Sequence, residues 1–428
     1  MSKEIKVDYL ARVEGEGALD IKLKDGKVES LQLGIFEPPR FFEAFLVGRS
    51  YLEVPDITAR ICGICPVAYQ MSSARALEKI VGISVPEDVK IVRRLLYLGE
   101  WIESHALHVY MLHAPDFLGY ESALEMAKDH ADLVKAALRL KRWGNRIMEI
   151  LGGRSVHPVS PRVGGFHRCP KKDELEPLLS EISDVKKTAM DAIDWAARLD
   201  FPSLRRDVEY VALRHNKEYA IVEGKIRSTA GIDAPEEDFS KLFLEGQVPY
   251  STALRYSIGG SKPYVVGPQA RVNVNHDRLA PEVQDRAKEA GVSFPIENPY
   301  MSIIARVLEV AHSVLEAEEI IREYKQPRAP HVNGKPRAGE GAAITEAPRG
   351  MLFHRYILDE KGIVKKANIV PPTAQNQTSM ELDLLELAPS LARMTTEKAT
   401  LLCEQTVRNY DPCISCSAHF LKLHLVSE

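Results

Sequence analysis

The chain contains Arg60-Ile61-Cys62-Gly63-Ile64-Cys65-Pro66 near its start and Asp411-Pro412-Cys413-Ile414-Ser415-Cys416-Ser417-Ala418-His419 near its end. Each stretch holds a C-x-x-C pair, whose two-residue gap lets both thiolates face one metal ion at a turn or a helix start. Because the pairs lie near opposite ends of 428 residues, a shared site would draw both ends of the chain together. We therefore predict one folding unit, a single domain over residues 1–428.

Four converging thiolates could bind zinc, iron, nickel or an iron–sulfur cluster, because soft ligands select these metals. A structural zinc is a common occupant of such a site, but it usually stabilises a small local module. A thioredoxin-like redox pair is less favoured, because neither pair follows a strand in a short βαβ unit. Arg60, Asp411 and His419 stand beside the cysteines and are more typical of a reactive site. The residues alone leave structural zinc and a reactive metal centre both open.

The composition of the chain excludes several other classes of protein. The chain has 56 Lys and Arg against 60 Asp and Glu, a net charge of −4, whereas nucleic-acid binders normally carry a basic excess. Hydrophobic residues make up 45% and charged residues 27%, which is ordinary for a globular protein. No apolar run reaches the roughly 18 residues of a membrane span, and residues 1–8 lack the apolar segment of a secretory signal. We predict a protein without a membrane span, a secretory signal or a nucleic-acid partner.

Hydrophobic periodicity predicts an α+β fold that is mainly helical, with a central bundle of long helices and small flanking antiparallel sheets. The predicted strands are 5–13, 18–23, 27–33, 353–358 and 363–370, with further short strands in 218–275. The predicted helices are 66–80, 86–113, 122–151, 172–199, 299–324 and 380–408, with a shorter helix that ends near residue 48. Residues 325–343 are rich in Pro, Gly, Lys and Arg, which favours an exposed loop.

The two cysteine motifs resemble those of NiFe hydrogenase large subunits, whose patterns are R-x-C-G-x-C and D-P-C-x-x-C-x-x-H. Residues 11–15, 152–158, 346–350 and 372–376 also resemble family segments and occur in the expected order. The resemblance covers almost the whole chain. It is strongest to the cytoplasmic, multi-subunit branch that couples hydrogen to NAD(P) or a deazaflavin, including the sulfhydrogenases. It implies the fold of the hydrogenase large subunit.

The resemblance implies that all four paired cysteines are metal ligands. Cys62 and Cys413 would be terminal nickel ligands, while Cys65 and Cys416 would bridge nickel and iron. The iron would carry CO and cyanide ligands in an apolar pocket, and the turn at 371–373 is expected to form part of its wall.

The same resemblance implies reversible heterolytic cleavage of H2 into protons and electrons, which makes the chain an oxidoreductase. Cys413 is expected to accept the first proton and Glu14 to relay it, since a buried carboxylate can accept and donate. Arg349 is expected to act electrostatically and to hold Asp411, because arginine stays protonated in proteins. From their local sequence alone, Glu14 could be a solvated strand residue, Arg349 an exposed turn residue and Asp411 a turn cap.

A second metal site is also implied, with Glu43, His419 and a backbone carbonyl near Ile369 as ligands. Oxygen ligands suit Mg²⁺, while a histidine would also accept Fe²⁺. The alternative for Glu43 is an ordinary carboxylate on a helix surface.

Two positions depart from the family pattern. Many relatives have Asp-His where this chain has Ser104-His105, which removes one carboxylate from the surroundings of the metals. Many also have a histidine where this chain has Tyr69, so a hydrogen bond to Cys65 is in doubt.

Electrons must leave this chain through partner proteins. Only Cys169 and Cys403 remain outside the two motifs, and an ordinary iron–sulfur cluster takes four cysteines. The chain also lacks G-x-G-x-x-G after a strand and lacks a P-loop. We expect an iron–sulfur small subunit, further subunits with flavin, iron–sulfur clusters and NAD(P), and electron transfer to NAD(P), sulfur or polysulfide. Two alternatives remain. One is a non-catalytic coupling subunit, like the related subunit of respiratory complex I, but that subunit lacks the four cysteines that this chain retains. The other is a zinc-stabilised scaffold.

Overall fold

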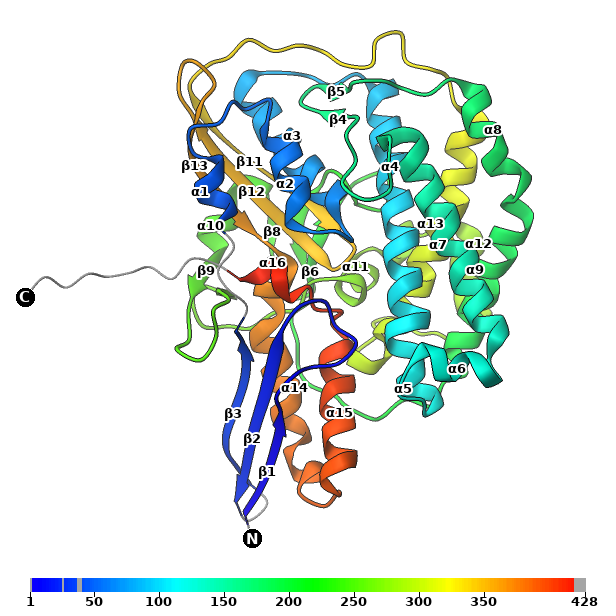
Figure 1. The fold of residues 1–428 in the computed structure, drawn as a ribbon, viewed down its shortest axis with the longest axis vertical. Helices are drawn as coiled ribbons and strands as arrows, with labels where there is room; N and C mark the ends of the chain where they lie inside the picture. Colours follow the sequence, from blue (N-terminus) through cyan, green and yellow to red (C-terminus); the bar gives the residue numbers. More distant parts are fainter. Residues whose placement is uncertain (1, 25–26, 37–40, 419–428) are drawn as a thin grey trace, which may run out of the picture.

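The computed structural model describes residues 2–24, 27–36 and 41–418, and Figure 1 shows three layers of secondary structure around a short central helix. A bundle of long helices stands on one side, and a sheet covered by helices lies on the other. A second sheet, backed by helices, projects below them. The predicted class, mainly helical with small antiparallel sheets, is confirmed.

The bundle is built from four long helices. They are α4 (Glu87–Ala106), α7 (Ala131–Gly152), α9 (Ile182–Ala197) and α13 (Ser302–Glu323). The crossing of α4 and α7 depends on two facing glycines, because a Cβ at Gly144 would lie 2.6 Å from the Gly99 carbonyl oxygen. Close approach of the two backbones buries Trp101 and Trp143 in the core.

Three of the helices predicted for this side of the molecule are interrupted in the structure. The predicted helix 122–151 is divided at His130 into α6 (Ala123–Asp129) and α7, because the His130 backbone leaves the helical region. The predicted helix 172–199 is divided at Glu181 into α8 (Lys172–Ser180) and α9. The predicted helix 86–113 ends as α4 at Ala106 and continues as a π-helical turn, Leu107–His113, and α5 (Ala114–Leu118).

The upper sheet is antiparallel, in the order β11 (Gly339–Ala347), β12 (Gly350–Leu358) and β13 (Val364–Val370). Helix α3 (Pro66–Val81) packs on β11 and continues directly from the first cysteine motif. The close contact requires Gly341, because a Cβ there would collide with the Ala76 carbonyl. The prediction of an exposed loop over 325–343 is therefore wrong from residue 339 onward, where small residues allow a buried strand.

The lower sheet contains β1 (Ser2–Val7), β2 (Gly17–Lys24) and β3 (Lys27–Ile35), and helices α14 (Pro372–Leu391) and α15 (Thr396–Arg408) pack against it. The predicted strand 5–13 ends early at Val7. The predicted helix 380–408 is two helices, and α14 begins at Pro372, a residue suited to a first turn.

The remaining elements are short. They are α1 (Phe42–Leu46), α2 (Val54–Thr58), β4 (Pro161–Arg162), β5 (Gly165–Phe166), β6 (Val211–Arg214), β7 (Lys225–Ser228), β8 (Asp233–Ala234), α10 (Phe239–Leu242), β9 (Phe243–Gly246), β10 (Arg255–Ile258), α11 (Pro268–Asn275), α12 (Pro281–Glu289) and α16 (Ile414–Ser417). Short strands within 218–275 are confirmed, but the last eight residues of that range form α11. In the described part of the chain, no helix is both long and apolar enough to cross a membrane.

The segment that follows β1 meets the second cysteine motif at the centre of the molecule, where α16 lies in Figure 1. The Ile414 amide donates to the Glu14 carbonyl oxygen at 2.8 Å, and Glu14 pairs with Cys413 in a parallel bridge. The Arg408 guanidinium donates to the Ala11 carbonyl oxygen at 2.8 Å. These contacts place the segment that follows β1 directly against the second cysteine motif.

A buried ion cluster holds this junction together. Asp116 of α5 accepts hydrogen bonds from Arg12 (2.5 Å), from both ends of the Arg408 fork (2.8 Å each) and from His113 (3.1 Å). Burial opposes ionisation of Asp116, but the hydrogen bonds from His113 and Arg408 lower its pKa below the ordinary value. Asp116 therefore binds the N-terminal segment to α15.

We expect Asp116→Asn to destabilise the fold by about 3–5 kcal/mol, because it removes the carboxylate that pairs with the buried Arg408 and the partly buried Arg12. The pKa of Asp116 is lower in the folded state, so its contribution is complete above about pH 4 and is lost as the pH falls below that value. Urea unfolding of both proteins should show a difference at neutral pH that shrinks on acidification. Asp129→Asn, at an exposed position of α6, is the matched control and should change little. An equal stability of wild type and Asp116→Asn at pH 7 would contradict this account.

Candidate metal centre

The first cysteine pair is presented by a turn before α3. A 3₁₀ turn, Ala59–Ile61, leads into an extended Cys62, and Cys65 then stands at the cap of α3 with Pro66 in its first turn. The backbone amides of Ile64 and Cys65 point at the Cys62 sulfur, at 3.4 and 3.3 Å. Amide donors of this kind stabilise a thiolate.

The second pair is presented in a similar way by α16, a single helical turn with Cys413 at its cap. The Cys413 amide donates to the Thr373 hydroxyl at 2.9 Å, so the start of α14 fixes the motif. Thr373 belongs to the turn that the sequence predicts as part of the pocket wall, and the structure places it against Cys413.

The two pairs meet in the interior of the protein. The sulfurs of Cys62 and Cys413 are 3.6 Å apart, and those of Cys413 and Cys416 are 2.6 Å apart. The sulfurs of Cys62, Cys413 and Cys416 all lie within 4.8 Å of one another, a spacing suitable for one metal site. Cys65 completes the cluster, and none of the four cysteines is more than 7% exposed.

The thiols influence one another strongly. Hydrogen bonds from Cys413, Cys416 and Cys65 lower the pKa of Cys62 well below the ordinary value for a thiol. Hydrogen bonds with Cys416, Cys62 and Cys65 raise the pKa of Cys413 well above it. Cys62 is therefore the thiol that ionises most readily in this cluster. Binding of a soft metal would deprotonate the remaining thiols as well.

Arg349 lies over this cluster. Its Nε donates to the Asp411 carbonyl oxygen at 2.7 Å, and its Nη2 donates to the Asp411 carboxylate at 3.1 Å. Its Nη1 is 4.0 Å from the Cys65 sulfur. Both residues are buried, so Arg349 is not an exposed turn residue, and Asp411 is more than a turn cap. The non-glycine Asp411 also has a φ of +50°, a strained conformation of the kind found at functional sites.

Glu14 lies between β1 and β2 rather than on a strand that faces solvent. Its backbone pairs with Cys413, and its carboxylate accepts a hydrogen bond from the Ser415 amide at 3.2 Å. The structure therefore brings Glu14 to the second cysteine motif, which sequence patterning alone could not decide.

The components of the implied second site lie together as far as the described residues extend. The Glu43 carboxylate on α1 accepts a hydrogen bond from the Ile369 amide of β13 at 2.7 Å. Burial raises the pKa of Glu43 to about 7, and its side chain borders a pocket of about 370 Å³. Glu43 is therefore not an ordinary surface carboxylate. His419 lies outside the described residues.

Sequence reasoning missed Glu100 as part of the site. Glu100 is a fully buried residue of α4, and its carboxylate accepts from the amides of Val67 (2.6 Å) and Ala68 (3.1 Å). It thereby caps α3, the helix that directly follows Cys65. A single glutamate within a predicted helix gives no signal of such a role, because glutamates there usually face solvent.

Both residues that depart from the family pattern are buried. Tyr69 is 1% exposed and packs its ring against His354 at 5.6 Å, while burial, followed by the charge of Cys416, raises its pKa well above the ordinary value. Ser104 is also buried. Asp116, another carboxylate of this region, binds Arg12, Arg408 and His113 and so does not replace the one that Ser104 lacks.

Comparison with known proteins gives a consistent picture. Residues 40–137 and 245–419 match the model of the nickel-dependent hydrogenase family. The alpha subunit of sulfhydrogenase 2 from Pyrococcus furiosus is 36% identical over 422 residues, which cover 98% of this chain and 100% of that protein. The beta subunit of the NAD-reducing hydrogenase HoxS from Cupriavidus necator is 27% identical over 472 residues, covering 98% and 96%.

The fold matches a solved structure equally well. The crystal structure of an NAD⁺-reducing NiFe hydrogenase in its H2-reduced state gives a TM-score of 0.89 at 26% identity, over 97% of this chain and 99% of that one. These matches favour a hydrogenase over a coupling subunit or a zinc-stabilised scaffold. The chain belongs to the nickel-dependent hydrogenase family and is a large, catalytic subunit, an oxidoreductase that acts on hydrogen, and its cysteine cluster fits a metal site.

Proposed function

We propose that Cys62, Cys65, Cys413 and Cys416 would hold a nickel–iron centre, to which all four would supply thiolate ligands. The observation that carries this proposal is the 3.6 Å approach of two sulfurs from opposite ends of the chain. The donor set fits a nickel–iron centre, because four thiols offer soft ligands and all four are buried away from water. We also propose that residues 1–428 form a single domain, since one metal site needs both ends.

When bound, the nickel–iron pair polarises H2 so that the molecule can be split heterolytically. In this proposal the Cys413 sulfur takes the first proton, and the Glu14 carboxylate receives it. The backbone bridge between these two residues supports the relay, because it keeps them side by side. Arg349 contributes a fixed positive charge above Cys65 and orients Asp411.

We further propose that the iron carries CO and cyanide ligands and that a second metal, Mg²⁺ or Fe²⁺, binds at Glu43, the Ile369 carbonyl and His419. The contact between Glu43 and Ile369 supports this second site, and the raised pKa of Glu43 means that a cation would also stabilise its charged form.

The proposed partners are an iron–sulfur small subunit and further subunits with iron–sulfur clusters, flavin and NAD(P). The two relatives described above support this assignment, because each is named as one subunit of a hydrogenase. NAD(P) is the proposed acceptor, since the Cupriavidus necator relative is named as NAD-reducing. Sulfur or polysulfide is the second candidate, favoured by the sulfhydrogenase relatives. We place the enzyme in the cytoplasm, where NAD(P) is available.

Metal analysis of the purified complex tests the proposed centre. We expect about one nickel per chain together with infrared bands of CO and cyanide, because a four-thiolate site selects soft metals. Acceptor assays with NAD⁺, NADP⁺ and polysulfide on the same sample should distinguish the electron acceptors. Zinc as the sole metal in an inactive complex would contradict the proposal.

A further inference from the structure

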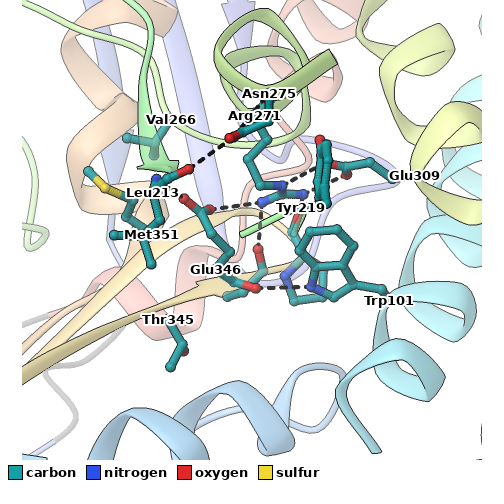
Figure 2. A network of polar contacts seen from close by, with 12 residues as sticks. Trp101, Leu213, Tyr219, Val266, Arg271, Asn275, Glu309, Thr345, Glu346 and Met351 are labelled. Atoms are coloured by element: carbon teal, nitrogen blue, oxygen red, sulfur yellow. Dashed lines mark hydrogen bonds and ion pairs between the residues drawn. The ribbon is translucent and has the colours of Figure 1, made fainter. Parts of the chain in front are cut away.

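A second buried polar network lies beside the metal centre, and Figure 2 shows it around Arg271 of α11. The Arg271 guanidinium is fully buried and makes two contacts of 2.7 Å with the Glu309 carboxylate of α13. It also stacks over the Trp101 ring, 4.3 Å from the ring centroid. Glu309 is fixed in turn by the Tyr219 hydroxyl at 2.8 Å. These contacts leave the guanidinium a single orientation.

The free edge of this guanidinium binds the backbone that leads into Arg349. Arg271 donates to the carbonyl oxygens of Ala347 and Pro348, both at 2.8 Å. Trp101 donates its indole N–H to the carbonyl oxygen of Glu346 at 2.9 Å. Three consecutive carbonyls immediately before Arg349 are therefore held by two side chains that are themselves fixed by helices.

The start of α11 also closes on the other side of Arg349. A Cβ at Gly267 would lie 2.9 Å from the Arg349 carbonyl oxygen, and a Cβ at Gly350 would lie 2.8 Å from the Gly267 amide nitrogen. Both glycines have a φ above +110°, which favours glycine. Residues of α11 and Gly267 before it therefore constrain the backbone on both sides of Arg349. This constraint fixes the position from which the Arg349 side chain extends to Asp411 and Cys65.

We propose that Arg271 is a positioning residue, which sets the Arg349 guanidinium at its place above Cys65. This inference rests on the proposed metal centre and on the role of Arg349 there. Arg271 does not act on the metals through its own charge, because Glu309 neutralises it at contact distance. It acts through the directions of its hydrogen bonds to the two carbonyls, a role that a lysine cannot fill.

Arg271→Lys in the assembled enzyme tests the proposal, because it retains the charge opposite Glu309 and removes the fork. We expect the kcat for H2 oxidation to fall by about 10- to 100-fold, since small misplacements near reacting groups are costly. The KM for H2 should change by less than about twofold, with nickel content unchanged and the nickel EPR signal shifted. In an Arg349→Lys background, the further Arg271→Lys change should cost less than about threefold, because the two residues act in series.

Arg93→Lys is the matched control. Arg93 is as deeply buried on α4 and makes the same kind of two-contact pair, with Glu78 at 2.9 and 2.5 Å. We expect it to lower thermal stability while kcat and the EPR signal stay as in wild type. Should Arg271→Lys fail to assemble, Glu309→Gln releases the guanidinium from α13 and should shift the nickel signal in the same way.

The proposal is overturned if Arg271→Lys leaves kcat and the nickel EPR signal unchanged, as expected for Arg93→Lys. It is also overturned if Arg271→Lys lowers kcat by the same factor in the Arg349→Lys background as in wild type. A different outcome identifies failure of the proposed function instead. If wild type contained no nickel, the assignment of the metal centre would be wrong, and the role of Arg271 would fall with it.

Discussion

Replacing Cys65 with serine is expected to abolish H2 uptake and to remove most of the nickel from the protein. A serine hydroxyl is a hard ligand that stays protonated at neutral pH, so the site would lose one of four soft donors. We expect activity to fall by more than about 10³-fold, because the metal supplies the polarisation on which the reaction depends. Methyl viologen reduction under H2, combined with elemental analysis of the same sample, measures both effects.

Cys169→Ser is the control for a thiol lost elsewhere. Cys169 is buried outside both motifs, and burial raises the pKa of its thiol to about 11, which makes it an inert cysteine. This variant should keep its nickel and its turnover. Full H2 uptake by Cys65→Ser would show that the assignment of Cys65 as a metal ligand is wrong.

Replacing Glu14 with glutamine is expected to slow proton transfer while the metals stay in place. The amide retains the shape of the side chain and can still accept the Ser415 amide hydrogen bond, but it cannot carry a proton. General acid–base groups typically contribute about 10²- to 10⁴-fold, and we expect a loss of that order in H2 turnover. The exchange of D2 with solvent protons, followed by mass spectrometry, measures the step directly.

Glu16→Gln, two residues along the same segment, separates the relay from a general effect of lost charge. It should leave D2 exchange within about twofold of wild type. The relay assignment would be disproved by Glu14→Gln turning over at the wild-type rate with a normal nickel content.

Local sequence patterns predicted the types of the long elements better than their ends. The periodic apolar stripe of 86–113 identified α4, but it could not show that the α-helix ends at Ala106, because a π-helical turn retains the same apolar residues. The strand over 339–347 was missed because its glycines and alanines lack strand propensity. Its formation depends on α3, which needs small residues beneath it.

The candidate functional residues also divide into those that the sequence identified and those that it missed. The four cysteines could be identified from sequence because their spacing is itself a chemical pattern, and Glu14, Arg349 and Glu43 followed from resemblance to a family. Glu100 and Arg271 carried no such pattern. Their roles depend on the buried amides and carbonyls that other elements direct at them.

The sequence by itself determined which soft donors this chain can offer to a metal, because donor type and motif spacing are local properties of Cys62, Cys65, Cys413 and Cys416. Only the tertiary structure decided how the surroundings are held, since the contacts of Asp116 with Arg408 and of Arg271 with Pro348 join segments far apart in the chain. Burial strengthens these contacts, because a charge pair or hydrogen bond is electrostatically stronger in the protein interior than in water.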